Sequence, residues 1–199
     1  MMQHNFDIII SGAGLAGLVT AVAFGSAGFD VLCVDPALPV TERDKPGADL
    51  RSTAFLQPAR DFLVSLGLWD HLSTHATPLE VMQIMDAGAG DKTPRVTKQF
   101  EARDISELPF GWNLPNWLLR RELLARLTEL PNVEFRPGVG TTSLFTRASE
   151  ARVGLSDGSR PRVRLVIAAD GRASPMREAA GINVKTTRYG QKALAFAVL

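Results

Sequence analysis

Apolar runs separated by polar and glycine-rich stretches predict alternating strands and a helix over residues 1–36. Apolar, mostly β-branched residues fill 6–10 and 31–34, and a helix rich in Ala, Val and Leu is expected between them, up to about Ala27. Strands that are apolar nearly throughout are typical of parallel strands covered on both faces. The pattern therefore predicts a strand–helix–strand unit of an α/β sheet.

Residues 37–49 are rich in proline and charge, which predicts an exposed loop. A helix is expected to follow, opened by Leu56-Gln57-Pro58 with proline at its first position and ended by Gly67. The residues expected on its buried side are Phe62, Leu63 and Leu66.

Residues 78–116 predict a different kind of sheet. Two short runs, 81–85 and 96–100, flank Gly88-Ala89-Gly90, and a further extended piece is expected at 110–112. Short strands joined by a glycine-containing turn are typical of antiparallel pairing.

The second half of the chain again predicts helix and strand. Leucines four residues apart indicate a helix over 117–129, namely Leu119, Leu123 and Leu127, with Leu124 widening the stripe. The further elements expected are a strand at 133–135, a hairpin turn at 156–159, an apolar strand at 165–169 and a short helix at about 175–180 that ends at Gly181.

Length and composition narrow the possible functions. The 199 residues allow one domain or one and a half, and 22 Lys and Arg balance 21 Asp and Glu to a net charge of +1, so nucleic acid is not an expected partner. The start has neither a signal-peptide pattern nor an apolar run long enough to span a membrane, which predicts a cytoplasmic protein. The single cysteine, Cys33, excludes an intramolecular disulfide and is expected to be a core thiol; no metal site is expected.

The candidate chemistry begins with a glycine motif, Gly12-Ala13-Gly14-Leu15-Ala16-Gly17, which matches G-x-G-x-x-G between the first strand and the first helix. In such a turn the first glycine permits a tight bend, the second lets backbone N–H groups approach a pyrophosphate, and the third allows close helix–strand packing. Asp35 ends the second strand, 35 − 12 = 23 residues after the first glycine, where a carboxylate can bind a ribose diol and disfavours a 2′-phosphate. These residues predict a dinucleotide site but do not choose between NAD and FAD.

Further segments make the resemblance more specific. An apolar strand runs into Asp170-Gly171, 170 − 12 = 158 residues after the first glycine, and resembles the second nucleotide-contacting motif of the flavoprotein aromatic hydroxylases. The stretch 49–54, which contains Arg51 and Ser52, and the helix that begins at Asn116 and contains Arg120 are similar to two other flavin-contacting segments of that family. The Arg-Ser-Thr-Ala stretch, the Leu-Gly-Leu-Trp at 66–69 and the Phe-Gly-Trp-Asn at 110–113 are similar to its ubiquinone-biosynthesis branch.

This resemblance implies FAD as cofactor, NADH or NADPH as transient reductant, and O2 and a phenolic, polyprenylphenol-type ring as substrates. It also implies site residues: the 12–17 backbone would hold the pyrophosphate and Asp35 the adenosine ribose. Arg51, Ser52, Asn116 and Arg120 would contact the FAD, near its ribityl–pyrophosphate stretch, and Asp170 and Gly171 would position the flavin or the nicotinamide. No catalytic side chain is implied, because the flavin carries the oxygen chemistry while the protein orients the ring and excludes water.

The resemblance predicts a Rossmann-like FAD-binding domain, 1–76 with 117–182, and an incomplete antiparallel substrate region, 77–116 with 183–199. The family's later Gly-Asp motif has no match in 172–199, so the chain is expected to be a truncated N-terminal portion without hydroxylase activity of its own. Residues 193–199 are expected to form an unfinished strand through which chains could self-associate. Peripheral contact with the inner membrane or a ubiquinone-biosynthesis complex is also compatible with the branch.

Two other functions remain open on the sequence. One is a catalytically inactive nucleotide-binding remnant, and the other is a different FAD- or NAD-dependent oxidoreductase. An NAD-dependent dehydrogenase would continue its parallel sheet after the second strand, whereas residues 78–116 predict antiparallel strands.

Overall fold

The computed structural model describes residues 5–88 and 93–194. Contacts divide the chain into two compact units, one formed by Met1–Arg51 with Asn116–Leu199 and the other by Ser52–Pro115. The first unit contains the glycine motif, Asp35 and Asp170.

The first unit is built on a six-stranded sheet in the order β8-β2-β1-β11-β10-β9. The strand β1 pairs in parallel with β2 and β11, and β2 pairs in parallel with β8, whereas β9 and β10 form an antiparallel hairpin. The strands are β1 (Asn5–Ser11), β2 (Val31–Asp35), β8 (Val133–Pro137), β9 (Thr141–Thr146), β10 (Ala151–Leu155) and β11 (Arg162–Ala168). The predicted strand–helix–strand unit with parallel strands is confirmed.

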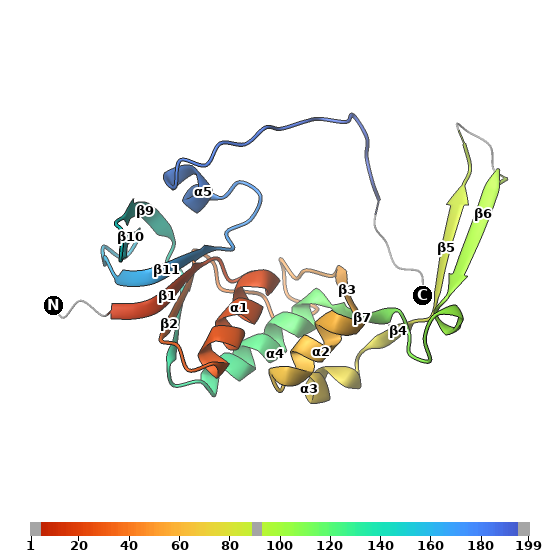
Figure 1. The fold of residues 1–199 in the computed structure, drawn as a ribbon, viewed down its shortest axis with the longest axis horizontal. Helices are drawn as coiled ribbons and strands as arrows, with labels where there is room; N and C mark the ends of the chain where they lie inside the picture. The colour runs from red at the N-terminus through yellow and green to blue at the C-terminus, as the bar shows by residue number, and fades with distance from the viewer. Residues whose placement is uncertain (1–4, 89–92, 195–199) are drawn as a thin grey trace. The chain divides into compact units, whose positions relative to one another are not determined.

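Both faces of the central strands are covered. Helices α1 (Leu15–Ser26) and α4 (Asn116–Thr128) lie side by side along one face (Figure 1). Toward the other face, Ile9 and Val34 pack in one apolar cluster with residues of the β9–β10 hairpin and with Met176 of α5 (Pro175–Ala179). Cys33 lies fully buried in β2, as expected, and burial, followed by the nearby Asp35 charge, raises the pKa of its thiol to about 12.

The leucine stripe predicted for the second helix is largely confirmed. Leu119, Leu123 and Leu127 of α4 are buried, together with Leu118, while Leu124 is half-buried. The hairpin turn predicted at 156–159 lies between β10 and β11, and the short predicted helix is α5, followed by Gly181 in the left-handed region (φ +69°).

The second unit is antiparallel, as predicted for residues 78–116. It contains a three-stranded sheet in the order β3-β7-β4 and a two-stranded β5–β6 hairpin. Of its predicted Gly88-Ala89-Gly90 turn, Ala89 and Gly90 lie outside the described residues. Its elements are β3 (Ser52–Leu56), α2 (Gln57–Ser65), α3 (Trp69–Ser73), β4 (Thr77–Leu79), β5 (Val81–Asp86), β6 (Val96–Glu101), the 3-10 helix η1 (Ala102–Asp104) and β7 (Gly111–Pro115).

One core residue of this unit was predicted wrongly. Leu63 and Leu66 are buried as expected, but Phe62 is 47% exposed. Adjacent helical residues are about 100° apart around the axis, so burying Leu63 does not bury its neighbour. Elsewhere in the unit the Arg60 guanidinium lies 5.4 Å from the centroid of the Trp69 ring and 5.5 Å from that of Trp112, which fixes α2 against α3 and β7.

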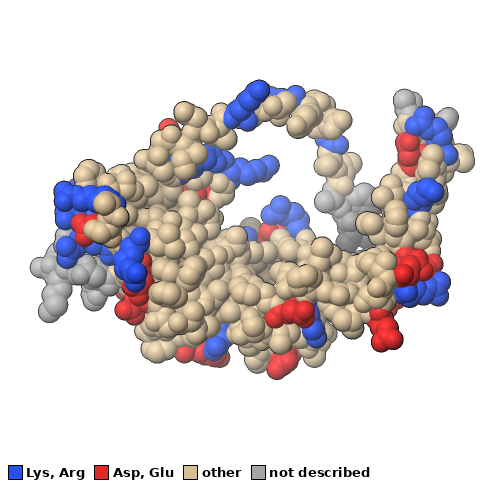
Figure 2. Space-filling model, viewed as in Figure 1, with Lys and Arg blue, Asp and Glu red and all other residues tan. Residues whose placement is uncertain are grey.

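Residues 182–194 carry no helix or strand, and the strand expected at 193–199 lies mostly outside the described residues. Within the described ranges, 5–88 and 93–194, we find no helix with the length and apolar character needed to cross a bilayer. Figure 2 shows side chains of both charges on the face in view, in keeping with the net charge of +1.

Candidate functional site

The glycine motif forms the turn between β1 and α1, and two of its glycines are required by packing. Gly12 has φ +103°, and a Cβ at this position would overlap the backbone carbonyl of Ala169. A Cβ at Gly17 would overlap the carbonyl oxygen of Gly12. Both glycines therefore allow the turn, the helix and the Ala169 backbone to lie close together.

Gly14 has a different environment. Its backbone (φ −67°, ψ 178°) is one that any residue can adopt, and among the described residues no heavy atom beyond its chain neighbours lies within 4 Å of the position a Cβ would take. It is the N-cap of α1, where the first backbone N–H groups of the helix have no partner inside the helix and carry a partial positive charge. Packing therefore does not require a glycine at position 14. An anion that approached the N-terminus of α1 would require one, because a side chain would block its access to the backbone N–H groups.

Asp35 lies at the end of β2 and binds the turn itself. Its Oδ2 accepts a hydrogen bond of 2.6 Å from the backbone N–H of Ala13, and its Oδ1 accepts one of 2.8 Å from Ala37. A carboxylate has about four acceptor positions, so two of them remain for a ribose diol. The structure thus gives Asp35 a role in holding the glycine turn that the sequence pattern did not indicate.

A cavity of about 630 Å³ lies at the carboxyl edge of the parallel strands. This volume is in the range of sites for small molecules and cofactors. Five of the predicted site residues line it: Gly12, Gly14, Asp35, Asp170 and Gly171. The residues that complete its lining are Ser11, Pro36, Gly140, Thr141, Thr142, Ser156, Ala169 and Pro175. Of the other motif residues, Ala13 is buried, while Leu15 and Ala16 begin α1 with partly exposed and exposed side chains.

Asp170, which lines this cavity, has one carboxylate oxygen without a partner among the described residues. Its Oδ2 accepts a hydrogen bond of 2.9 Å from the backbone N–H of Met176, which begins α5. Its Oδ1 is buried and has no hydrogen-bond partner within the described part of the chain. Because a buried acceptor without a partner is costly, a ligand hydroxyl or N–H is its natural partner.

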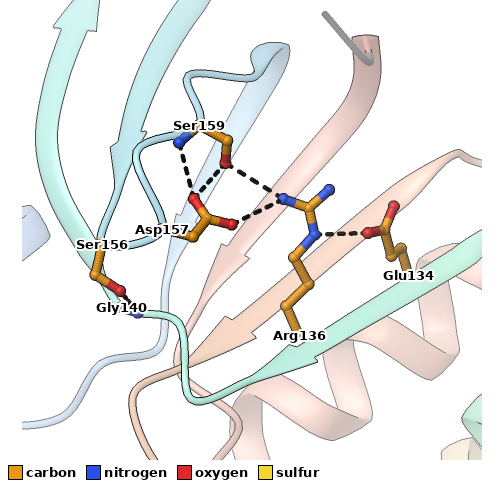
Figure 3. Close-up of polar contacts among 6 residues, drawn as sticks. All are labelled: Glu134, Arg136, Gly140, Ser156, Asp157 and Ser159. Atoms are coloured by element: carbon orange, nitrogen blue, oxygen red, sulfur yellow. Dashed lines mark hydrogen bonds and ion pairs between the residues drawn. The ribbon is translucent and has the colours of Figure 1, made fainter. Parts of the chain in front are cut away.

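Part of the cavity lining is formed by two backbone segments that are tied together (Figure 3). Ser156 Oγ accepts a hydrogen bond of 3.0 Å from the Gly140 N–H, and the Ser156 N–H donates to the Gly140 carbonyl at 2.8 Å. Beside them, Arg136 of β8 donates to Glu134 at 2.6 Å and forms an ion pair of 3.4 Å with Asp157. Hydrogen bonds from Ser159, followed by the Arg136 charge, lower the pKa of Asp157, so this carboxylate stays charged and fixes the 156–159 turn.

Three other predicted residues, Arg51, Asn116 and Arg120, gather around a residue that the sequence did not single out, Asp49. The carboxylate of Asp49 accepts hydrogen bonds of 2.8 Å from both Arg51 Nε and an Arg51 terminal nitrogen, and one of 3.0 Å from Asn116 Nδ2. Arg120 lies 3.6 Å from the same carboxylate, and its own Nε is buried without a partner in the described residues. The Arg51 hydrogen bond is the main reason that the pKa of Asp49 lies far below its usual range.

Ser52 is not among the residues that line the cavity. It begins β3 in the second unit, where it is exposed and pairs with Pro115. The sequence also missed the cavity wall, because Thr141 and Ser156 are ordinary turn and strand residues without a local signature. The acid of Asp49 stands two residues before Arg51, which is the only local signal for it.

Together, the strand–glycine turn–helix unit, the acid at the end of β2 and the cavity at the carboxyl edge define a dinucleotide-binding α/β protein. The chain belongs to the FAD binding domain family, which it matches over residues 5–199. The matched relatives and structures include ubiquinone hydroxylases and flavin-dependent monooxygenases, so the predicted fold class and family are confirmed.

The curated relatives include ubiquinone hydroxylases. The chain is 33% identical over 192 residues to ubiquinone hydroxylase UbiL of Rhodospirillum rubrum, covering 96% of this chain and 43% of the relative. It is 26% identical to the 3-demethoxyubiquinol 3-hydroxylase of Escherichia coli, covering 100% of this chain and 49% of that enzyme. The chain thus spans less than half the length of these relatives.

Solved structures agree on the fold. The flavin-dependent monooxygenase PieE, solved with FAD and substrate, is 25% identical with a TM-score of 0.70, over 89% of this chain and 32% of PieE. The p-nitrophenol 4-monooxygenase PnpA of Pseudomonas putida is 21% identical with a TM-score of 0.72, over 90% of this chain and 44% of PnpA, and supports the fold alone.

Proposed function

We propose that this chain is the FAD-binding portion of a flavin-dependent monooxygenase that hydroxylates a phenolic, polyprenylphenol-type ring in ubiquinone biosynthesis. The observation that supports FAD binding most directly is the open Cβ position of Gly14, which lines the same cavity as Asp170. The named ubiquinone hydroxylases among the relatives support the substrate class.

The residues present fit an FAD. The N-terminus of α1 at Gly14 suits a pyrophosphate, and Asp35 has acceptor positions left for a ribose diol. Asp170 Oδ1 would accept a hydrogen bond from a cofactor hydroxyl or ring N–H, and Gly171, with φ +89°, turns the backbone away after it. Arg51, Asn116 and Arg120 would face the phosphates or the ribityl chain from the start of α4.

When bound, FAD would supply the transfer of one oxygen atom from O2 to the ring, with NADH or NADPH as the source of electrons. The chain's own residues would bind and orient the cofactor and keep water from one side of it. We assign no acid, base or nucleophile to the chain.

The cofactor is tested by purifying the chain, denaturing it and identifying any released nucleotide by mass, with an FAD titration followed by flavin fluorescence for protein that has lost it. FAD is the expected nucleotide. Release of NAD instead would refute the assignment, and failure to bind either nucleotide would favour the alternative of an inactive remnant. The hydroxylation itself is tested with a protein of the relatives' full length, by comparing hydroxylated phenol formed with reductant consumed.

A further inference from the structure

We propose that Asp49 is a positioning residue that holds Arg51, Asn116 and Arg120 as one preformed anion-binding cluster at the start of α4. This inference rests on the proposed function, because the anion it serves is the phosphate part of the dinucleotide. Asp49 itself would not touch the ligand.

The geometry gives Asp49 the central place in this cluster. Its side chain is only 12% exposed; its oxygens accept hydrogen bonds from Arg51 and Asn116, and Arg120 forms an ion pair with it at 3.6 Å. Along the chain Arg51 precedes the second unit, whereas Asn116 and Arg120 follow it. The backbone N–H of Asn116 also donates to the Arg51 carbonyl at 2.9 Å, so the 49–51 segment is fixed to the first residue of α4. The acid therefore sets where both guanidiniums lie.

The two arginines keep N–H donors for a ligand while they are paired with Asp49. A guanidinium has five N–H donors, and the two-point contact with Asp49 uses two of those on Arg51. Arg51 is 77% exposed, so its remaining donors can reach solvent or a ligand, and the Arg120 Nε–H is buried without a partner in the described residues. Two guanidiniums and one carboxylate leave a net positive charge, which favours an anion.

The cluster lies at the same edge of the sheet as the cavity. Helix α1 leads into β2 and α4 leads into β8, and β2 and β8 are parallel, so the N-terminal ends of both helices lie at the carboxyl edge. Figure 1 shows α1 and α4 side by side in this orientation. A ligand that spans this edge can therefore meet both helix N-termini.

Removing the Asp49 carboxylate has two opposing effects on the affinity for an anion. Asp49→Asn removes a negative charge, which by itself would strengthen anion binding. In this variant an NH2 group replaces one carboxylate oxygen: at the Oδ2 position it faces the donors of Arg51, Asn116 and Arg120, and at the Oδ1 position it faces Arg51 Nε. Either orientation breaks the two-point contact with Arg51, which must then lose more rotamer freedom on binding. Because Arg51 is so exposed, we expect the loss of position to dominate.

The experiment measures the dissociation constant of FAD by flavin fluorescence for wild type, Asp49→Asn and Asp49→Glu, with ADP as a second probe that lacks the flavin. Asp49→Asn should weaken binding of both by about tenfold, and Asp49→Glu should recover part of that loss because it retains the charge. The matched control is Asp86→Asn, which also removes one carboxylate paired with an arginine, at 2.7 Å from Arg95 in the second unit. It should leave FAD and ADP binding unchanged.

Equal or tighter binding of FAD by Asp49→Asn than by wild type would overturn the positioning role while leaving FAD binding itself intact. Absence of FAD binding by the wild-type chain would instead overturn the proposed function together with this inference. Thermal unfolding of each variant separates lost affinity from lost folding: if Asp49→Asn fails to fold, the smaller Asp49→Ser variant is measured in its place, and wild-type affinity of that folded variant would refute the role.

Discussion

Replacing Gly14 by valine should remove nucleotide binding while leaving the fold nearly intact. The position has room for a side chain, because no described heavy atom beyond the chain neighbours lies within 4 Å of where its Cβ would be, and φ −67°, ψ 178° suits valine. The main cost to the fold is a less favourable N-cap for α1, about 1 kcal/mol. For a chain of this length that lowers the melting temperature by about 2–4 °C.

The effect on the ligand should be much larger. A valine side chain would occupy the space where phosphate oxygens would approach the first N–H groups of α1. Losing two hydrogen bonds to a charged group, at about 1.5–3 kcal/mol each, removes about 3 kcal/mol or more of binding free energy. This corresponds to a loss of affinity of at least about a hundredfold.

The assay combines a fluorescence titration with FAD and a thermal melt followed by circular dichroism. Ala125→Val, on the exposed side of α4, is the matched control for an added valine: it should leave FAD affinity unchanged and lower the melting temperature slightly, because valine is a weaker helix former than alanine. Gly17→Ala should do the opposite of Gly14→Val and unfold the protein at a much lower temperature, because its Cβ would overlap the Gly12 carbonyl. Wild-type affinity in Gly14→Val would show that the glycine turn is not the phosphate site.

Two further substitutions test the acids. Asp35→Ala should lower the free energy of unfolding by about 1–3 kcal/mol and weaken FAD binding, because the Ala13 and Ala37 N–H groups lose their acceptor. Urea unfolding that matches wild type would contradict the role of Asp35 in holding the glycine turn. Since the folded pKa of Asp49 is lowered, this acid stabilises the folded protein above its unfolded pKa of about 4, and that stability is lost as the pH falls below it. The difference in unfolding free energy between wild type and Asp49→Asn should therefore shrink below about pH 4, and a difference independent of pH would contradict the lowered pKa.

The parts of the fold that the sequence predicted are those that depend on near neighbours. The apolar runs in β1 and β2 identify buried parallel strands because every residue there faces either a helix or the β9–β10 side of the sheet. The leucine stripe of α4 similarly reports its packing against α1. Both signals are contained within a dozen residues.

The features that were missed depend on distant pairs. Asp49 lies in a segment that the sequence correctly predicts as a polar loop, yet its side chain is largely buried. Its hydrogen-bond partner Asn116 is 67 positions away in the chain, so no local pattern could reveal the contact. The strands β3 and β4 were not predicted either, because short strands beside a central β7 have no periodic pattern long enough to detect. Charge and hydropathy therefore predict the loop correctly but do not predict that Asp49 is buried within it.

The separate roles of the glycines also bear on whether this portion binds a nucleotide or is an inactive remnant. Gly12 and Gly17 would be retained in either case, because the close approach of the turn, α1 and Ala169 requires them for folding. Gly14 and Asp170 are different: no described neighbour requires a glycine at the first, and the buried Oδ1 of the second lacks a partner within residues 5–88 and 93–194. A protein released from nucleotide binding would gain stability by capping α1 with a better residue at 14 and by removing the unpaired acceptor at 170. These two positions, rather than the motif as a whole, are why we favour a binding site over a remnant.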